Sequence, residues 1–148
     1  MGPRMIGLLR QRLRILLAVV MIGIGVTHFV KPDDFAAIVP PSFPAKMALV
    51  LISGVAEIAG GVGLLLPRWR RWASLGLVAL YVAVFPANVN MAVNDVAVAG
   101  VHVPAALLWL RLPFQLVFIA WAIFVGRADV PTPASSSPSR ELPSTPRG

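Results

Sequence analysis

Four long apolar segments follow one another along this chain, separated by short polar or proline-rich stretches. They cover residues 13–30, 46–66, 72–91 and 104–125. Each approaches the length of about 20 residues that an α-helix needs to cross a bilayer core. None alternates with the period of two that is typical of a half-buried strand. The pattern therefore predicts an all-α protein, a four-helix transmembrane bundle.

The connections between these segments carry turn and helix-breaking residues. Between the first two segments, Pro40, Pro41 and Pro44 lie within five residues and cannot continue a helix. The second connection, residues 67–71, is short enough to predict an antiparallel helix pair. The third is a small loop around Asn94, Asp95 and Gly100. We therefore expect these segments to be the loops of the bundle.

Three regions follow from this pattern. Residues 1–12 form a basic flank, residues 13–126 the four-span membrane domain, and residues 127–148 a tail rich in proline and serine. The tail lacks apolar residues that could form a core, so we predict that it is disordered. The first segment also has the basic start and apolar centre of a cleaved signal peptide, but no small-x-small cleavage site follows Val26.

The composition supports a membrane protein. Hydrophobic residues make up 57% of the 148 residues and charged residues only 13%, whereas soluble domains carry about 25% charged residues. The net charge of +7 comes from basic residues at the ends of the apolar segments rather than from one patch. This distribution is typical of anchoring at a membrane surface, and we expect no binding of nucleic acid.

The absence of cysteine and the scarcity of histidine limit the chemistry of the chain. Without cysteine, it forms no disulfide, thiolate metal site or thiol relay of its own. The two histidines, His28 and His102, lie far apart in the sequence and do not form a metal-binding motif. We therefore predict no metal site.

The distribution of lysine and arginine predicts the orientation of the bundle. Ten of these residues fall on the side of the termini, namely Arg4, Arg10, Arg12, Arg14, Arg68, Arg70, Arg71, Arg127, Arg140 and Arg147. Three fall on the other side, namely Lys31, Lys46 and Arg111. Because basic loops stay in the cytoplasm, we expect a multi-pass protein of the plasma membrane with both termini in the cytoplasm.

Ionisable and polar residues inside a span are costly, so the few that occur are informative. Glu57 lies near the middle of the second segment, and Gly54 and Gly61 share its helix face, where they would let a neighbouring helix approach. His28 lies near the outer end of the first segment and has proton exchange as its natural chemistry. We therefore expect Glu57 to point into the bundle, either protonated or paired; the alternative to a functional role is a buried carboxyl group that only hydrogen-bonds between helices.

The third and fourth segments carry the other polar candidates. Asn88 and Asn90 follow Pro86, so their amides have two readings: they satisfy the loosened backbone or bind a ligand. Arg111 and Gln115 are four residues apart and share a helix face. The alternative for Arg111 is that it extends toward the interface beside Trp109.

These candidates converge in depth. When the four segments are placed antiparallel, the six residues His28, Glu57, Asn88, Asn90, Arg111 and Gln115 all fall in the outer half of the bilayer. We therefore predict one polar pocket near the non-cytoplasmic face. Within it, we expect Glu57 to pair with Arg111 or to hydrogen-bond His28.

Several stretches, in this order, resemble the DoxX-like family of small four-span membrane proteins. They are Gly25 to Phe29, Ile38 to Pro41, Ser53 to Gly61, Leu64 to Pro67, Phe85 to Asn88 with Met91, and Trp109 to Pro113 with Gln115. The resemblance covers about residues 13–126. It implies the four-span architecture and an association with redox enzymes, one relative being a subunit of a thiosulfate:quinone oxidoreductase. Related proteins that handle disulfides use cysteine pairs, which this chain lacks.

Three functions are consistent with this reading. The first is a redox-associated subunit whose pocket holds a quinone head group, with Glu57 and His28 handling protons and a partner protein supplying electrons. The second is a non-catalytic membrane protein that binds lipid or stabilises a partner complex. The third is a small proton-coupled transporter with Glu57 as carrier, for which a chain of this length would need to form a homo-oligomer. The sequence leaves open whether the chain itself is an enzyme.

Overall fold

The computed structural model describes residues 3–97 and 102–127. Within them, the chain forms five helices and no strand: α1 (Pro3–Val30), α2 (Pro32–Ile38), α3 (Lys46–Leu65), α4 (Arg70–Asn94) and α5 (Ala105–Gly126). All except the short α2 are long and apolar enough to cross a membrane. Large apolar side chains such as Val19, Ile52, Val82 and Leu116 are exposed on these four helices. In a bilayer such side chains face lipid, so the predicted all-α transmembrane bundle is confirmed.

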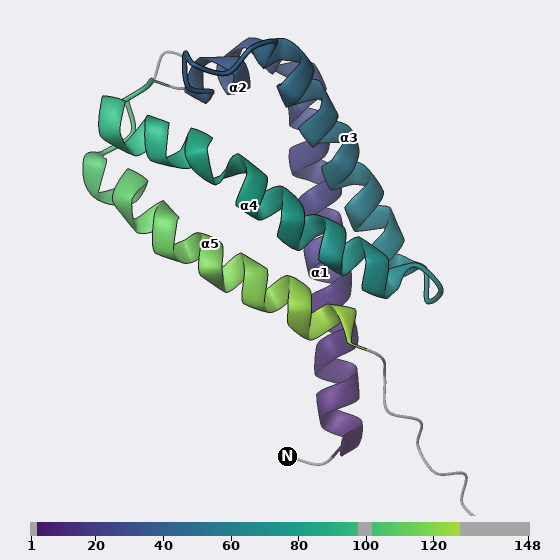
Figure 1. Cartoon of the computed structure of the whole chain (residues 1–148). Coiled ribbons are helices and arrows are strands. Elements are labelled where there is room, and N and C mark those ends of the chain that lie inside the picture. The colour runs from purple at the N-terminus through teal and green to yellow at the C-terminus, as the bar shows by residue number, and fades with distance from the viewer. Residues whose placement is uncertain (1–2, 98–101, 128–148) are drawn as a thin grey trace, which may run out of the picture.

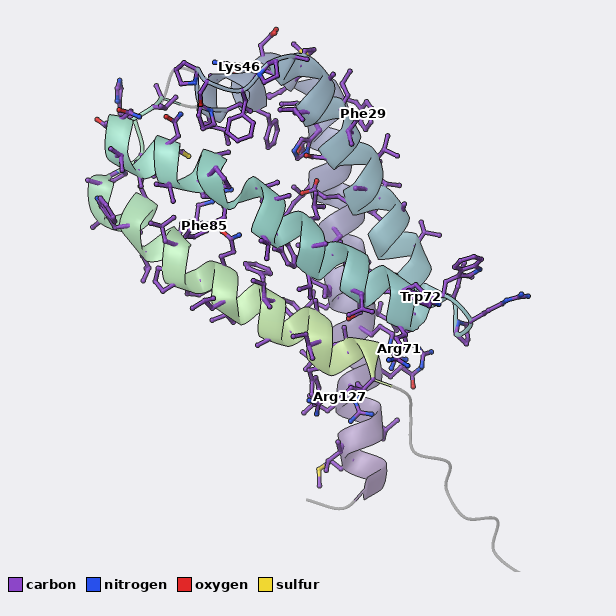
Figure 2. The ribbon with its side chains drawn as sticks, in the orientation of Figure 1. Phe29, Lys46, Arg71, Trp72, Phe85 and Arg127 are labelled. Carbon is purple, nitrogen blue, oxygen red and sulfur yellow. The ribbon has the colours of Figure 1, made fainter. Side chains whose placement is uncertain are left out.

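The four long helices form two pairs that diverge from one another. Helix α1 packs along α3, and α4 packs along α5. Figure 1 shows the pairs meeting where α5 crosses α1, and separating toward the end of the bundle that α2 covers. We call this second end the α2 end. The opposite end carries Arg71 and Arg127, as Figure 2 shows, and we call it the arginine-rich end.

Helix α1 begins ten residues earlier than predicted, at Pro3 instead of residue 13. Most of the basic flank, residues 1–12, therefore belongs to the same helix as the first span. Leucine, arginine and glutamine are good helix formers, and proline is favoured at the first helical position. Hydropathy identified residues 13–30, but the more polar residues before them continue the same helix.

Helix α2 was not predicted, and the expectation of a non-helical connection over its residues was wrong. Pro32 stands at the start of the helix, and Asp33 and Asp34 occupy its first turn. Proline fixes a helical φ without losing a needed donor, and acidic side chains interact favourably with the helix dipole there. The prolines from Pro40 to Pro44 lie outside the helix and separate it from α3.

Glycines allow α1 and α3 to pack with their backbones close together. A Cβ atom at Gly25 would lie 2.8 Å from the carbonyl oxygen of Gly54, and one at Gly54 would lie 2.8 Å from Cβ of His28. Farther along, a Cβ at Gly61 would lie 2.8 Å from the carbonyl oxygen of Ala18. Small residues at a membrane helix contact maximise van der Waals packing. This contact positions Glu57 beside α1.

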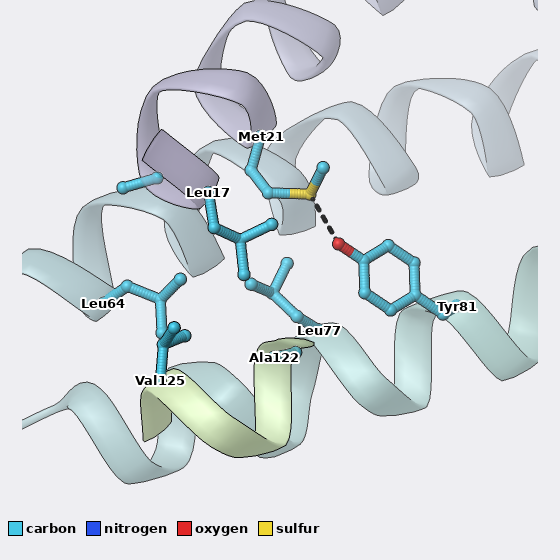
Figure 3. Close-up of a cluster of buried hydrophobic side chains, with 8 residues drawn as sticks. Leu17, Met21, Leu64, Leu77, Tyr81, Ala122 and Val125 are labelled. Carbon is cyan, nitrogen blue, oxygen red and sulfur yellow. Dashed lines mark hydrogen bonds between the residues drawn. The ribbon is translucent and has the colours of Figure 1, made fainter. Parts of the chain in front are cut away.

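The main apolar core lies toward the arginine-rich end. It contains Leu17, Ala18, Met21, Leu64, Leu77, Tyr81, Ala122 and Val125, and Figure 3 shows these side chains converging from α1, α3, α4 and α5. Tyr81 Oη donates a hydrogen bond of 3.0 Å to Met21 Sδ at one edge of this core. A smaller cluster of Ile38, Met91, Ala92 and Leu108 lies at the α2 end. The space between the two clusters is where the candidate site lies.

Hydrogen bonds fasten the helices at the arginine-rich end. Arg14 Nε donates to the carbonyl oxygen of Val125 over 3.1 Å, and Ser74 Oγ donates to that of Ala122 over 2.7 Å. Trp121 Nε1 donates to the carbonyl oxygen of Leu13 over 3.2 Å. These bonds hold the last turns of α5 against α1 and α4, so the two helix pairs are closed at this end.

Two predictions concern segments that the structure describes only in part or not at all. In the third connection, Asp95 follows α4 with a positive φ of 46°, while Gly100 lies outside the described residues. The predicted disorder of the tail concerns residues 127–148, of which only Arg127 is described. Arg140 and Arg147, on which the predicted orientation partly rests, also lie outside the described residues.

Candidate functional site

A cavity of about 670 Å³ lies between the two helix pairs, in the half of the bundle nearer α2. Its walls come from all five helices and are mostly apolar, and such a volume is within the range of small-molecule sites. Five of the six candidate residues line it, namely His28, Glu57, Asn88, Arg111 and Gln115. The sixth, Asn90, does not. The structure therefore brings most of the predicted polar residues to one cavity.

His28 and Glu57 meet on one wall of the cavity. His28 Nδ1 lies 3.2 Å from Glu57 Oε2 and 3.1 Å from the carbonyl oxygen of Ile24. The Nδ1–H group donates to the Ile24 carbonyl oxygen, one turn earlier in α1, and lies close to the carboxyl group of Glu57. Both residues are buried, with 7% and 9% of their surfaces exposed.

Glu57 Oε2 is buried and has no hydrogen-bond partner among the described residues. The short contact with His28 Nδ1 does not change this, because it lacks hydrogen-bond alignment. Burying a carboxyl oxygen without a hydrogen bond is costly. The atom is therefore the clearest position in the cavity for a polar group of a ligand.

Helix α2 and the segment after it cover the end of the cavity. The ring of Phe35 stacks on the ring of His28, with 3.9 Å between the ring centres. Ile38, Val39 and Phe43 also line the cavity. Asn90 Nδ2 donates to the carbonyl oxygen of Ile38 over 2.9 Å, so this candidate residue fastens α2 to α4 instead of facing the cavity.

The amides of Asn88 and Gln115 join α4 to α5. Asn88 Nδ2 donates to Gln115 Oε1 over 2.9 Å, and Gln115 Nε2 donates to the carbonyl oxygen of Tyr81. Tyr81 lies in the helical turns that precede Pro86, where a proline loosens backbone bonding. The reading of these amides as structural is therefore favoured, but the donor to the backbone of α4 is Gln115 rather than an asparagine.

Arg111 does not pair with Glu57, contrary to one expectation. His28, the other expected partner, does lie 3.2 Å from Glu57, but the two form a contact rather than the predicted hydrogen bond. Glu57 instead contacts His28, because the glycine contact between α1 and α3 brings these two residues together. Among residues 3–97 and 102–127, no acidic side chain forms an ion pair with Arg111. Its side chain lines the cavity from α5 and is exposed. The cavity therefore contains a permanent positive charge for which the described residues supply no counter-charge.

The chemistry available to this arrangement is binding and proton exchange. The apolar walls suit an apolar body, and polar groups stand on facing helices: the His28–Glu57 contact on α1 and α3, and Arg111 on α5. Within the described residues, no three acidic or histidine side chains gather to hold a metal ion. The cavity therefore combines a mostly apolar wall with a few polar groups.

Sequence reasoning missed two aromatic residues of the site. Tyr81 lines the cavity and links α4 to α1 through Met21, and Phe35 stacks on His28. Tyr81 is the only tyrosine in the chain and lies in the middle of the third apolar segment, a signal that could have identified it. Phe35 had no such signal because its helix was not predicted.

Comparison with protein families gives a match over residues 17–126. The matching family is described as "Domain of unknown function (DUF8561)". The chain belongs to this family. The DUF8561 match begins within α1 and ends with the last residue of α5, so it takes in every residue that lines the cavity. Neither the curated proteins nor the solved structures contain a significant match.

Proposed function

We propose that this DUF8561 protein is a redox-associated membrane subunit that binds a quinone in the cavity between its helix pairs. One observation carries the proposal: the buried Glu57 Oε2 has no hydrogen-bond partner among the described residues and borders a mostly apolar cavity of about 670 Å³. A prenylated quinone has an apolar body and a head with two carbonyl oxygens. The resemblance to the DoxX-like family, in which one relative is part of a quinone-dependent enzyme, supports this choice of ligand.

Glu57 and His28 have the chemistry to manage the protons of a quinone. Reduction of a quinone to a quinol takes up two electrons and two protons. A carboxyl group in contact with an imidazole at 3.2 Å can hold a proton and pass it to a ring oxygen. Arg111, on the facing wall, can donate a hydrogen bond to the second ring oxygen. The proposal assigns the supply of electrons to a partner protein, because the chain has no cysteine for thiol chemistry.

The proposal includes an orientation in the plasma membrane. The described arginines Arg68, Arg70, Arg71 and Arg127 gather at the arginine-rich end, and Lys31 and Lys46 lie at the α2 end. The positive-inside rule favours the arginine-rich end, with both termini, in the cytoplasm. The cavity would then lie in the outer half of the bilayer.

Co-purification tests the proposal. The protein is purified from its native membrane in mild detergent, and bound quinone is extracted and identified by mass spectrometry. We expect quinone with the unaltered protein and at least a roughly ten-fold loss in Glu57→Gln, a difference of about 1.4 kcal/mol in binding. Asp95→Asn serves as the control, because it makes the same change of a carboxyl group to an amide at an exposed residue that does not line the cavity.

Two results would count against the proposal. One is a correctly folded protein that retains no quinone and binds none when a short-chain quinone is added. The other is equal retention of quinone by Glu57→Gln and Asp95→Asn, which would show that the quinone binds elsewhere. Thermal unfolding of each variant in the same detergent establishes that the proteins compared are folded.

A further inference from the structure

Arg111 stands at a depth where an unpaired charge is costly. It lies six residues after Ala105, the first residue of α5, which is about 9 Å along the helix axis. Neighbours on the same stretch, Leu107, Leu110 and Phe114, are large, apolar and exposed. A guanidinium at this level of a span needs water, a carboxylate or a lipid head group. No described acidic residue supplies the carboxylate.

The surroundings of Arg111 favour an anion attached to an apolar chain. The guanidinium lines the same cavity as Leu107, Leu110 and Phe114, and the cavity continues toward Phe118 along α5. An anion at Arg111 would therefore have apolar space beside it. A guanidinium binds phosphate oxygens with two parallel hydrogen bonds, which makes arginine well suited to phosphate recognition.

We infer that Arg111 binds the phosphate group of an anionic phospholipid, with one acyl chain of that lipid lying in the apolar part of the cavity. The head group would satisfy the unpaired charge, and the chain would fill space that the diverging helix pairs leave open. The inference goes beyond the proposed quinone site, because the lipid needs Arg111 and not Glu57, whereas the quinone needs Glu57 and uses Arg111 only as a second contact. The two ligands would use the same apolar space, so they would compete for the cavity.

Native mass spectrometry with defined lipids tests this inference. The full chain in detergent is mixed with phosphatidylglycerol or with phosphatidylcholine of the same acyl chains, and the lipid-bound fraction is measured. We expect preferential binding of phosphatidylglycerol, and about a ten-fold weaker binding to Arg111→Gln. Arg111→Lys should retain part of the binding, because it keeps the charge but loses the paired hydrogen bonds.

Two further variants separate this site from general attraction of lipid to a basic protein. Arg127→Gln removes an arginine at the opposite end of α5 and should leave the binding unchanged. Ala83→Phe places a large ring into the cavity from α4 and should weaken the binding while leaving Arg111 in place. Folding of each variant is checked by thermal unfolding in the same detergent.

The outcomes are distinct. Equal binding of the two lipids, or equal losses in Arg111→Gln and Arg127→Gln, would overturn the inference. Binding that Ala83→Phe does not alter would also overturn it, because the acyl chain would then lie outside the cavity. The inference would also be overturned if a co-purifying protein were cross-linked at Arg111 through a carboxylate, in place of lipid. Inorganic phosphate alone should not compete, since it lacks the chain. Loss of quinone binding would leave the inference intact.

Discussion

His28 Nδ1 lies 3.2 Å from Glu57 Oε2, across the contact between α1 and α3. The same nitrogen lies 3.1 Å from the carbonyl oxygen of Ile24. One N–H group therefore donates to the backbone of α1 and contacts a carboxyl group of α3. The two residues are 29 positions apart in the sequence and are joined only because Gly25 and Gly54 let α1 and α3 approach. This contact connects the packing of the bundle to the chemistry of the cavity.

The contact between His28 and Glu57 predicts non-additive effects on stability. His28→Leu should lower the stability by about 1–3 kcal/mol, because it leaves the buried carboxyl group without its polar neighbour. In a Glu57→Leu background the same change should cost less, since no carboxyl group remains to be satisfied. The thermal unfolding midpoints of the two single variants and the double variant in one detergent measure the coupling. Equal costs in both backgrounds would mean that the two side chains are energetically independent.

The α1–α3 contact predicts that alanine substitutions at Gly54 and Gly23 affect the stability of the protein differently. At Gly54 a Cβ atom would meet His28 Cβ at 2.8 Å and the Gly25 carbonyl oxygen at 3.0 Å, so Gly54→Ala should destabilise by about 1–3 kcal/mol. At Gly23 nothing lies within 4 Å of such an atom, so Gly23→Ala should be neutral or stabilise by up to about 1 kcal/mol through helix propensity. Unfolding of both variants in detergent checks this. A Gly54→Ala protein as stable as the unaltered one would contradict the close packing.

Arg14 is buried, unlike its neighbour on the same helix, Arg12. Only 4% of its surface is exposed, and its Nε donates to the carbonyl oxygen of Val125 near the end of α5. Arg14→Met should therefore lower the stability by about 1–3 kcal/mol, because a buried carbonyl loses a charged donor. Arg12→Met removes an exposed charge and should change it by less than about 0.5 kcal/mol. Similar losses in both variants would show that Arg14 acts through net charge alone.

The proposed orientation predicts opposite accessibility of the two ends of the bundle. The chain has no cysteine, so each introduced cysteine is the only one to react. Ser42→Cys lies in the exposed segment between α2 and α3, and Trp69→Cys lies in the turn between α3 and α4. In intact cells a membrane-impermeant maleimide should label the first and not the second. Labelling of Trp69→Cys alone would reverse the orientation, and permeabilised cells confirm that both thiols can react.

Hydropathy alone was sufficient for the main architecture. The second and fourth spans begin and end within one residue of their predicted limits, because α3 and α5 end where proline or extended backbone follows the apolar run. The helices of the first and third spans, α1 and α4, extend beyond their predicted limits. Polar residues such as Arg10 and Asn94 continue these helices without adding to the hydropathy. Helix α2 was missed because seven residues are too few for a pattern of apolar positions.

The sequence by itself determined which residues are expensive to bury, and therefore which are informative. Inside apolar segments, a glutamate, a histidine or an arginine stands out however the helices are arranged. The free-energy cost of placing such a side chain in lipid does not depend on the fold. It also placed them at a similar depth, since helix length converts position into height.

Only the tertiary structure decided which of these residues meet. The glycine contact between α1 and α3 places Glu57 beside His28. The two helix pairs diverge, so Arg111 lies on the facing wall without a described acidic partner. Likewise, the amides of Asn90 and Gln115 donate to the backbone carbonyls of Ile38 and Tyr81, and only Gln115 also lines the cavity. Partners depend on which helix faces lie together, and that follows from side-chain packing among all four spans rather than from the hydropathy of any one of them.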